Sequence, residues 1–389
     1  MRNLLAVLCG IVFLPLLAQT PSNFQDFLNL LENQPKSAKT AVIEAFIESQ
    51  IRLPILEDNK VIFLAKGYTS QSPHLLADFN GFLHPRYVAD STLGQMHSIP
   101  GTSWYYFQKE LLPDSRVLYQ FNRGDTTYND PLNSQIGTRF GQPYSEITMP
   151  GYQVSAELMA DKAIPVGQVE KQLFPSIIMD HERTIHIYTP PGYETATDSL
   201  PTIYLHDGSD YLDLGRVRQI LDYLIHNKKI KPLIAVFDDP VIRGKEYRRD
   251  EDYKNYIDRE LIPHIHRNYR TLSDKQFRGI IGGSRGGLSA LSIAHSLDKF
   301  GKCGVFSPAI FPSDLQEFIE FLTNSHTPPT QVYMLGAIYD HIWYPDALRL
   351  KKYFENSGVD FTYMEISEGH NIEAWRTQLD EMLTRFFPF

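Results

Sequence analysis

The second half of the chain alternates between short apolar runs and amphipathic stretches, and this pattern constrains the fold more than any other feature. The apolar runs have the length of strands, and the stretches between them have the period of helices. Alternating strands and helices form a largely parallel sheet with helices on both faces. We expect strands at 183–189, 201–206, 232–238, 276–283, 302–307, 331–337 and 361–367. We expect helices at 213–226, 252–267, 285–297, 313–323, 345–356 and 371–386.

Residues 58–145 have a different pattern, in which short alternating runs are separated by Gly, Pro, Asn, Asp and Ser. Such alternation is typical of antiparallel strands with one buried face, and it predicts a small β-sandwich. Apolar stripes at helical spacing predict a helical segment within 19–57. The fold class is therefore α/β, with a domain at 160–389 of mostly parallel sheet and helices on both faces, preceded by the sandwich and the helical segment.

The N-terminus has one early cation, Arg2, followed by an apolar run from Leu4 to Ala18. The run is short for a membrane span, and the combination is typical of a secretory signal peptide. We expect a signal peptide at 1–18 and an exported protein, periplasmic or secreted, with no stable membrane span after cleavage. An uncleaved anchor is the alternative.

Composition excludes several classes of protein. Hydrophobic residues make up 42% of the chain and charged residues 21%, which is typical of a globular protein and not of a disordered one. The 37 basic residues against 46 acidic ones give a net charge of −9, so no nucleic-acid partner is expected. Two cysteines cannot support a disulfide framework.

The strongest local signal lies at 282–286, where Gly-Gly-Ser-Arg-Gly fits the pattern G-x-S-x-G. An apolar strand precedes it and a helical pattern follows, which is the setting of a nucleophile elbow. In that turn the central residue, Ser284, stands exposed above the sheet, and the glycines leave room where side chains would collide. The alternative is a glycine-rich helix start that only binds an anion.

A serine nucleophile needs an adjacent base, and in elbow enzymes the acid and then the histidine follow the serine along the chain. The histidines after Ser284 are His295, His326, His341 and His370. We favour His370, because it lies in a turn beyond the last predicted strand, where active-site loops gather in such sheets. His295 falls inside a predicted helix, His326 precedes a strand, and His341 is expected to be a pocket or surface residue.

The acid is expected at the end of the preceding strand, which points to Asp340. Its carboxylate would accept the Nδ1–H of His370 and fix the ring tautomer. Asp346 and Glu368 are the rivals, the first as a helix N-terminal carboxylate and the second as a residue that shapes the loop of the histidine.

Acyl transfer also needs donors for the developing oxyanion. One is the backbone N–H after the nucleophile, at Arg285. The other is expected in the loop after the strand at 201–206, from the N–H of Ser209 or Gly208.

Residues 181–389 resemble the esterase family of α/β-hydrolases, which includes enterochelin esterases, feruloyl and acetyl-xylan esterases and mycolyltransferases. The matching segments occur in one order along the chain, at 183–193, 205–208, 243–247, 260–265, 282–287 and 369–376. Segments 76–82 and 130–133 resemble the early-set immunoglobulin-like domain that precedes the catalytic domain in enterochelin esterases.

The resemblance implies a serine carboxylesterase with Ser284, Asp340 and His370 as triad, Ser209 and Arg285 N–H groups as oxyanion hole, and no metal or organic cofactor. Its substrate is a small-molecule or glycan-linked ester: a siderophore trilactone, or alternatively a feruloyl or acetyl ester of polysaccharide. A non-catalytic binding protein on the same scaffold is the alternative of another class. The matching segments suggest Arg243, Glu246 and Trp375 as substrate-binding residues. Arg285 is added because it departs from the polysaccharide esterases, in which the residue after the serine is usually apolar or small, and an arginine there could bind a catecholate or carboxylate of the substrate.

Overall fold

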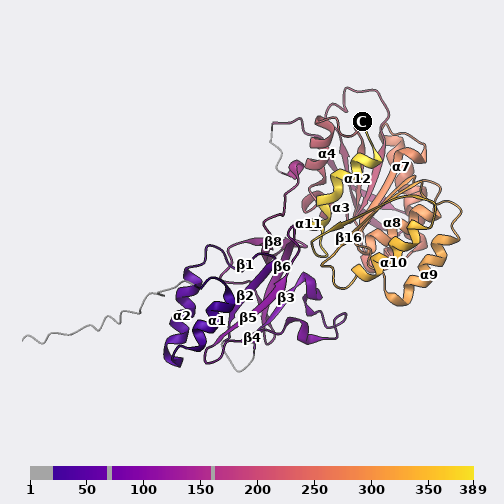
Figure 1. Cartoon of the computed structure of the whole chain (residues 1–389). Coiled ribbons are helices and arrows are strands. Elements are labelled where there is room, and N and C mark those ends of the chain that lie inside the picture. The colour runs from indigo at the N-terminus through magenta and orange to yellow at the C-terminus, as the bar shows by residue number, and fades with distance from the viewer. Residues whose placement is uncertain (1–20, 68–71, 159–162) are drawn as a thin grey trace, which may run out of the picture.

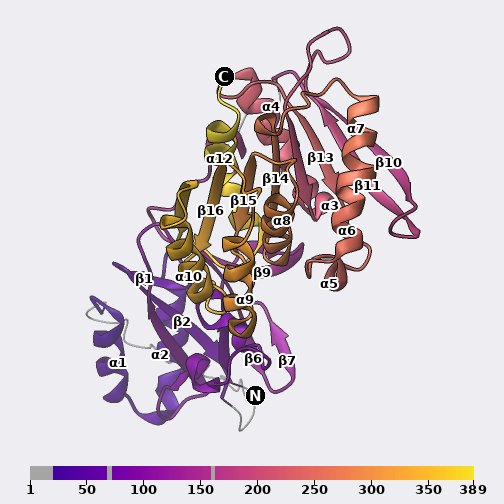
Figure 2. The ribbon, with the colours of Figure 1, turned by 90° about the vertical axis from the view of Figure 1, so that its right-hand side faces the viewer.

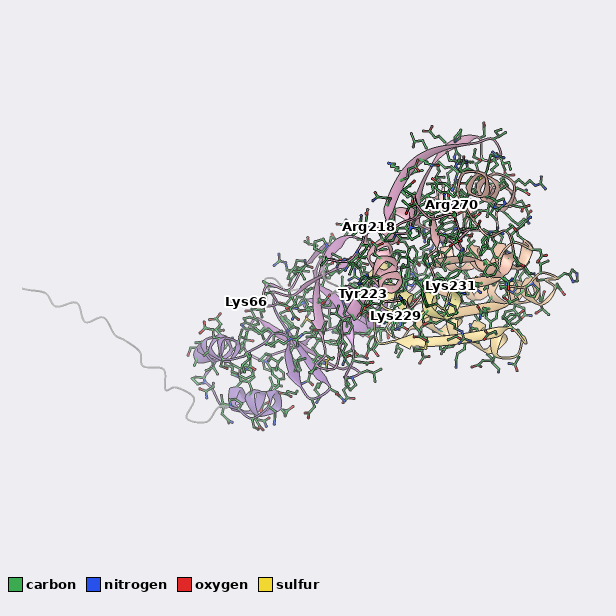
Figure 3. The ribbon with its side chains drawn as sticks, turned by 90° about the horizontal axis from the view of Figure 1, so that it is seen from above. Lys66, Arg218, Tyr223, Lys229, Lys231 and Arg270 are labelled. Carbon is green, nitrogen blue, oxygen red and sulfur yellow. The ribbon has the colours of Figure 1, made fainter. Side chains whose placement is uncertain are left out.

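The computed structural model describes residues 21–67, 72–158 and 163–389. Its N-terminal helices and strands form one body and its α/β part forms another, as the three views of Figure 1, Figure 2 and Figure 3 show. The expected signal peptide lies outside the described residues, so export stays a prediction. Among the helices of the described ranges, none is long and apolar enough to cross a bilayer.

The α/β body is built on a mixed sheet of eight described strands, in the order β10-β11-β13-β12-β14-β15-β16-β17. From β13 to β17 all neighbouring strands are parallel, whereas β10, β11 and β13 pair antiparallel. The bounds are β10 (Gln168–Ser176), β11 (His181–Thr189), β12 (Thr202–His206), β13 (Ile234–Asp238), β14 (Arg278–Gly283), β15 (Lys302–Phe306), β16 (Gln331–Ala337) and β17 (Asp360–Ile366). All seven expected strands are present, and β10 is an additional strand.

Helices cover both faces of this sheet, as expected, and bury the central strands completely (Figure 2). One face carries α6 (Glu251–Tyr256), η4 (Ile257–Leu261), α7 (Ile262–Asn268), α8 (Arg285–Ser296), α9 (Pro312–Thr323) and α10 (Tyr344–Glu355). The other carries α3 (Gly208–Asp213), α4 (Val217–His226), α11 (Ile372–Trp375) and α12 (Leu379–Phe386). The short elements α5 (Arg243–Glu246), η5 (Lys275–Phe277) and η6 (Arg376–Gln378) connect them.

The N-terminal body is a sandwich of two antiparallel sheets that share one apolar core. One sheet has the order β1-β2-β5-β4, and the other has the order β3-β6-β9-β8 with β7 beside β6. The strands are β1 (Ile55–Glu57), β2 (Lys60–Lys66), β3 (His74–Ala77), β4 (His97–Ser98), β5 (Trp104–Glu110), β6 (Arg116–Arg123), β7 (Thr126–Tyr128), β8 (Ile136–Arg139) and β9 (Gln142–Thr148). Two 3₁₀ turns, η1 (Asp78–Leu83) and η2 (Ser91–Gly94), lie in its connections, and a third, η3 (Ala156–Leu158), follows β9 and contacts α4 of the α/β body.

The helical segment packs on the outer face of the first sheet. It consists of α1 (Phe24–Glu32) and α2 (Lys36–Glu48). Phe27 and Phe46 stack with their ring centroids 3.8 Å apart, and both belong to a cluster with Ile62 and Leu64 of β2. The α/β domain preceded by β-sheets, which the sequence predicts, is confirmed.

The sandwich is bound to the loop that follows β17 by a hydrogen bond and an ion pair. The Arg116 N–H donates to the Ser367 carbonyl at 3.0 Å, and the Arg116 guanidinium is paired with the buried Glu368 at 2.9 Å. Asp78 packs against the next residue, since a Cβ placed on Gly369 would come within 2.0 Å of its carboxylate. The sandwich therefore contacts the loop immediately before His370.

Asp78 should make the stability of the protein depend on pH. It is 4% exposed, and burial raises its pKa from 3.8 to about 7 despite the opposing charge of Arg139. Between pH 3.8 and about pH 7, the Asp78 carboxyl is deprotonated in the unfolded chain but still protonated in the folded chain. This group's contribution to the free energy of unfolding therefore falls as the pH rises, by up to about 1.4 kcal/mol per pH unit.

The variant Asp78→Asn should remove that slope, because its amide oxygen can still accept the Leu118 N–H that Asp78 accepts at 2.7 Å. In urea titrations, the free energy of unfolding of the variant should rise relative to that of the wild type as the pH is raised from 4.5 to 8. Asp125→Asn, in an exposed turn, is the control. A stability difference that does not change with pH would contradict the expectation.

Candidate active site

Ser284 occupies the sharp turn between β14 and α8. Its backbone has φ 58° and ψ −127°, a strained conformation for a residue with a side chain. The preceding glycines are required by close approaches: a Cβ on Gly282 would lie 2.4 Å from the backbone of α8, and one on Gly283 would lie 2.1 Å from the Trp375 ring. This is the geometry of a nucleophile elbow.

His370 and Asp340 lie together, as the sequence predicts. The His370 Nδ1–H donates to Asp340 Oδ2 at 2.6 Å, and Asp340 Oδ1 accepts the Trp343 N–H at 3.2 Å. Asp340 follows β16 and His370 follows β17, so both stand at the carboxyl edge of the parallel strands. Since Nδ1 is bound to the carboxylate, Nε2 is the ring nitrogen left for a proton transfer.

Ser284 opens into a cavity of about 270 Å³, and two aromatic residues of its lining, Trp375 and Phe140, lie near the His370 ring. Trp375, which lines the cavity, stands edge-on to His370 with ring centroids 5.1 Å apart, and Phe140 lies 6.5 Å from the same ring. The cavity is lined by Phe140, Asp207, Asp210, Arg243, Ser284, Ile372 and Trp375. The structure thus gathers Ser284 and the His370–Asp340 pair around one site.

The rival acids are held elsewhere. Asp346 pairs with Arg349 on α10 at 2.6 Å. Glu368 is buried and pairs with Arg116, and burial raises its pKa.

The other histidines are also placed outside the site. His295 is buried in α8, its Nδ1 bonds the Leu291 carbonyl at 2.9 Å, and burial lowers its pKa to about 4. His326 and His341 are exposed.

The structure differs from the expectation for Ser209. Its N–H donates to Asp239 Oδ1 at 2.7 Å, and its hydroxyl bonds the other oxygen of the same carboxylate. An N–H that is satisfied by a carboxylate is not held ready for an oxyanion, so the choice of Ser209 is corrected. Gly208, at the first position of α3, remains the alternative donor in this loop. The N–H of Arg285 starts α8, where the helix dipole favours negative charge.

Two of the four expected substrate-binding residues line the cavity of Ser284, and Glu246 does not. Arg243 reaches it while making a two-pronged ion pair with Asp207, at 2.7 and 2.9 Å. Trp375 lines it and donates its indole N–H to the Ser307 hydroxyl at 3.1 Å.

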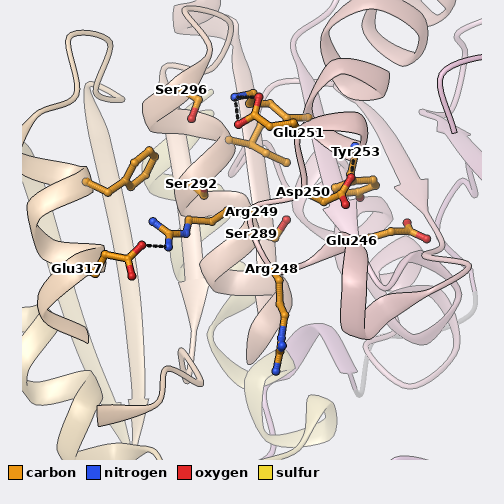
Figure 4. Close-up of a pocket in the computed structure, with 13 residues that line it drawn as sticks. Glu246, Arg248, Arg249, Asp250, Glu251, Tyr253, Ser289, Ser292, Ser296 and Glu317 are labelled. Atoms are coloured by element: carbon orange, nitrogen blue, oxygen red, sulfur yellow. Dashed lines mark hydrogen bonds and ion pairs between the residues drawn. The ribbon is translucent and has the colours of Figure 1, made fainter. Parts of the chain in front are cut away.

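Glu246 is only 1% exposed. It pairs with Arg183 at 2.9 Å and accepts the N–H groups of Val241 and Ile242. Glu246 lines the cavity shown in Figure 4 and not that of Ser284, and its carboxylate is bound to these partners within the domain, so its assignment to substrate binding at Ser284 is corrected.

Arg285 lines a second cavity, of about 490 Å³, on the α8 and α9 side of the elbow. Its guanidinium lies 5.7 Å from the centre of the Phe311 ring. Arg248 and Arg249 extend this cavity into an adjoining one, shown in Figure 4, where Arg249 is paired with Glu317. The lining of the second cavity therefore combines three arginines with aromatic surface and with the two acidic residues Asp314 and Glu317.

Sequence reasoning missed the part that the sandwich plays at the site. The Tyr339 side chain, one residue before the acid, enters the core of the sandwich. Its hydroxyl accepts the Leu112 N–H at 2.9 Å and lies 3.0 Å from the Ser115 hydroxyl. The loops of Asp340 and His370 are thus both held by the N-terminal domain.

No group of three or more His, Cys, Asp or Glu side chains that could hold a metal ion occurs in residues 21–67, 72–158 and 163–389.

The elbow and its sheet define an α/β-hydrolase type of domain, and comparisons with known proteins place it more closely. Residues 176–346 match the model of the family described as "Putative esterase". The match contains Ser284 and Asp340 and ends before His370. The resemblance to this esterase family, expected from the sequence, is confirmed.

The chain is 28% identical to the protein YbbA of Bacillus subtilis over 154 residues. This match covers 35% of this chain and 61% of YbbA. It is 27% identical over 172 residues to an endo-1,4-beta-xylanase/feruloyl esterase of Xylanibacter ruminicola, covering 40% of this chain and 24% of that protein. The chain therefore spans about three fifths of the first relative and one quarter of the second.

The fold extends beyond these matches. The enterobactin esterase FES of Shigella flexneri, solved in the presence of enterobactin, superposes with a TM-score of 0.68 at 19% identity. The superposition covers 88% of this chain and 97% of that one, so it includes the N-terminal body as well as the α/β domain.

Proposed function

We propose that the protein is a serine carboxylesterase that works through Ser284, His370 and Asp340. The observation that carries the proposal is the His370–Asp340 hydrogen bond of 2.6 Å, found at the same carboxyl edge of the sheet as a serine in the strained elbow conformation. Strain of this kind persists where the surrounding structure enforces it, and it clusters at active sites.

In the proposed mechanism, Ser284 Oγ attacks the ester carbonyl carbon while its proton passes to His370 Nε2. Asp340 holds the ring and stabilises the imidazolium. The N–H of Arg285 donates to the tetrahedral oxyanion, with a second donor from the loop at Gly208. The C–O bond breaks and the alcohol leaves with the proton of His370. Water then attacks the acyl-enzyme by the same route, releasing the acid and restoring Ser284.

The substrate that we favour is a siderophore trilactone of the enterobactin type. Two observations support it: the fold shared with FES over both bodies, and the cavity of Arg285 and Phe311, which suits an anionic aromatic group. A feruloyl ester of polysaccharide is the second candidate, supported by the identity to the xylanase/feruloyl esterase. A side-by-side hydrolysis assay distinguishes the two candidate substrates. It compares ferric enterobactin, a feruloylated arabinoxylan oligomer, an acetylated xylan oligomer and nitrophenyl acetate.

Replacing Arg285 with glutamine should separate charge recognition from chemistry. The backbone N–H stays in place, so turnover of nitrophenyl acetate should change less than twofold. A charge-assisted contact is worth about 1.5–3 kcal/mol, so kcat/KM for ferric enterobactin should fall about 10- to 100-fold.

Arg218→Gln is the matched control, because Arg218 lies exposed on α4, which covers the opposite face of the sheet from α8 (Figure 3). If Arg285→Gln lowers kcat/KM equally for nitrophenyl acetate and ferric enterobactin, Arg285 does not recognise the charge of the substrate.

A further inference from the structure

The tip of a hairpin in the N-terminal domain reaches the cavity of Ser284. Strands β8 and β9 are joined by two residues only, Phe140 and Gly141, because Arg139 pairs with Gln142. β8 lies against α11 of the α/β domain (Figure 1), and the Gly141 N–H approaches Glu373 Oε1 at 3.5 Å. The hairpin therefore crosses from one domain to the catalytic edge of the other.

Phe140 is an unusual residue for this turn. Both central residues have positive φ, 49° at Phe140 and 74° at Gly141, as a type I′ turn requires. Asn, Asp or Gly normally occupies the first of these positions, and a bulky side chain there costs about 1–2 kcal/mol. The side chain is 44% exposed, so burial offsets only part of this cost. Turn chemistry alone therefore does not explain an aromatic residue at this point.

The position of the ring supplies an explanation. Phe140 lines the same cavity as Ser284 and Arg243, and its centroid lies 6.5 Å from that of His370. The Arg139 guanidinium lies 5.2 Å from the Phe140 ring and 4.6 Å from the ring of Phe82, so it holds Phe140 from the side of the sandwich. The two-residue turn and this cation–π contact hold the apolar ring of Phe140 near Ser284 and His370.

We propose that Phe140 is a specificity-determining residue, through which the N-terminal domain contacts an aromatic part of the ester bound at Ser284. The proposal rests on the esterase function proposed above. Aromatic rings in contact gain about 0.5–1.5 kcal/mol beyond the area that they bury. Phe140 thus selects for esters that carry an aromatic acid or alcohol, and the N-terminal domain is part of the substrate site.

The test is Phe140→Asn, because asparagine is favoured in this turn position and the hairpin should keep its shape. The probes are 2-naphthyl acetate, with an aromatic alcohol, methyl ferulate, with an aromatic acid, and ethyl acetate, with neither. We expect kcat/KM for at least one aromatic ester to fall about tenfold, mainly through KM, while ethyl acetate changes less than twofold. Phe140→Trp should retain the preference for aromatic esters. Phe389→Asn, at the exposed C-terminus, is the matched control.

An equal change on all three esters, or no change on any, overturns the proposal for Phe140. The melting temperature of Phe140→Asn, compared with wild type, shows whether the fold is retained. The esterase function fails by a different result, namely turnover of these esters that persists in Ser284→Ala. The two failures are therefore distinguishable in one set of assays.

Discussion

Replacing Ser284 with alanine is expected to lower kcat for ester hydrolysis by about 10⁴- to 10⁶-fold while leaving the protein folded. The hydroxyl is the attacking group in the proposed mechanism, and no acyl-enzyme can form without it. The methyl group of alanine fits the same elbow, whose backbone conformation is set by the close approach of β14 to α8. Steady-state kinetics on nitrophenyl acetate and a thermal melt of both proteins provide the measurement.

Ser289→Ala is the matched control for this variant. Ser289 also belongs to α8 and is buried, but it lies in the neighbouring cavity of Figure 4 and not in that of Ser284. Its loss should leave kcat within about twofold of the wild type. If Ser284→Ala keeps more than a tenth of the wild-type turnover, the nucleophile lies elsewhere. If the wild type itself turns over none of the esters but binds one of them, the binding-protein alternative gains support.

The strands and helices that carry the site were predictable because each has a strong local pattern. β14 and α8 flank the elbow with an uninterrupted apolar run and an amphipathic helix. β10 was not predicted, since most of its residues are exposed or half-buried on the edge of the sheet and it contains Pro175. A strand of this kind is held by pairing with β11 and has little hydrophobic periodicity of its own.

The errors at the site have a different origin. The sequence motif around Glu246 pointed to substrate, yet its carboxylate is committed to Arg183 and two backbone N–H groups inside the domain. Ser209 was expected to donate to substrate, and Asp239 accepts its N–H instead. In both cases the deciding partner is distant in sequence, so a pattern confined to one segment does not reveal it.

The contribution of the N-terminal domain was hidden for the same reason. Arg116, Phe140 and Tyr339 each act across the boundary between the two bodies, over sequence separations of more than 200 residues. A local signal for Phe140 did exist, because Phe-Gly replaces the Asn-Gly or Asp-Gly that such a turn favours. It becomes informative only when the hairpin is seen to end beside His370.

Replacing Asp340 with asparagine should lower kcat by about 10⁴-fold, with KM changed much less. The carboxylate accepts the Nδ1–H of His370 at 2.6 Å and so leaves Nε2 unprotonated to receive the serine proton. Asparagine can offer its NH₂ group to the ring in place of an acceptor, which favours the opposite tautomer and puts the proton on Nε2. The charge that stabilises the imidazolium is lost as well. Kinetics on nitrophenyl acetate measure the loss.

Asp346→Asn is the control that tests the assignment of the acid. Asp346 is also a buried carboxylate close in sequence, but its partner is Arg349 on the surface of α10. Its replacement should change kcat less than threefold. Near-normal turnover in Asp340→Asn together with a large loss in Asp346→Asn would move the acid to Asp346. The opposite result would establish that His370 depends on the carboxylate of Asp340, which follows β16. The neighbouring Tyr339 side chain holds this loop in the core of the N-terminal domain.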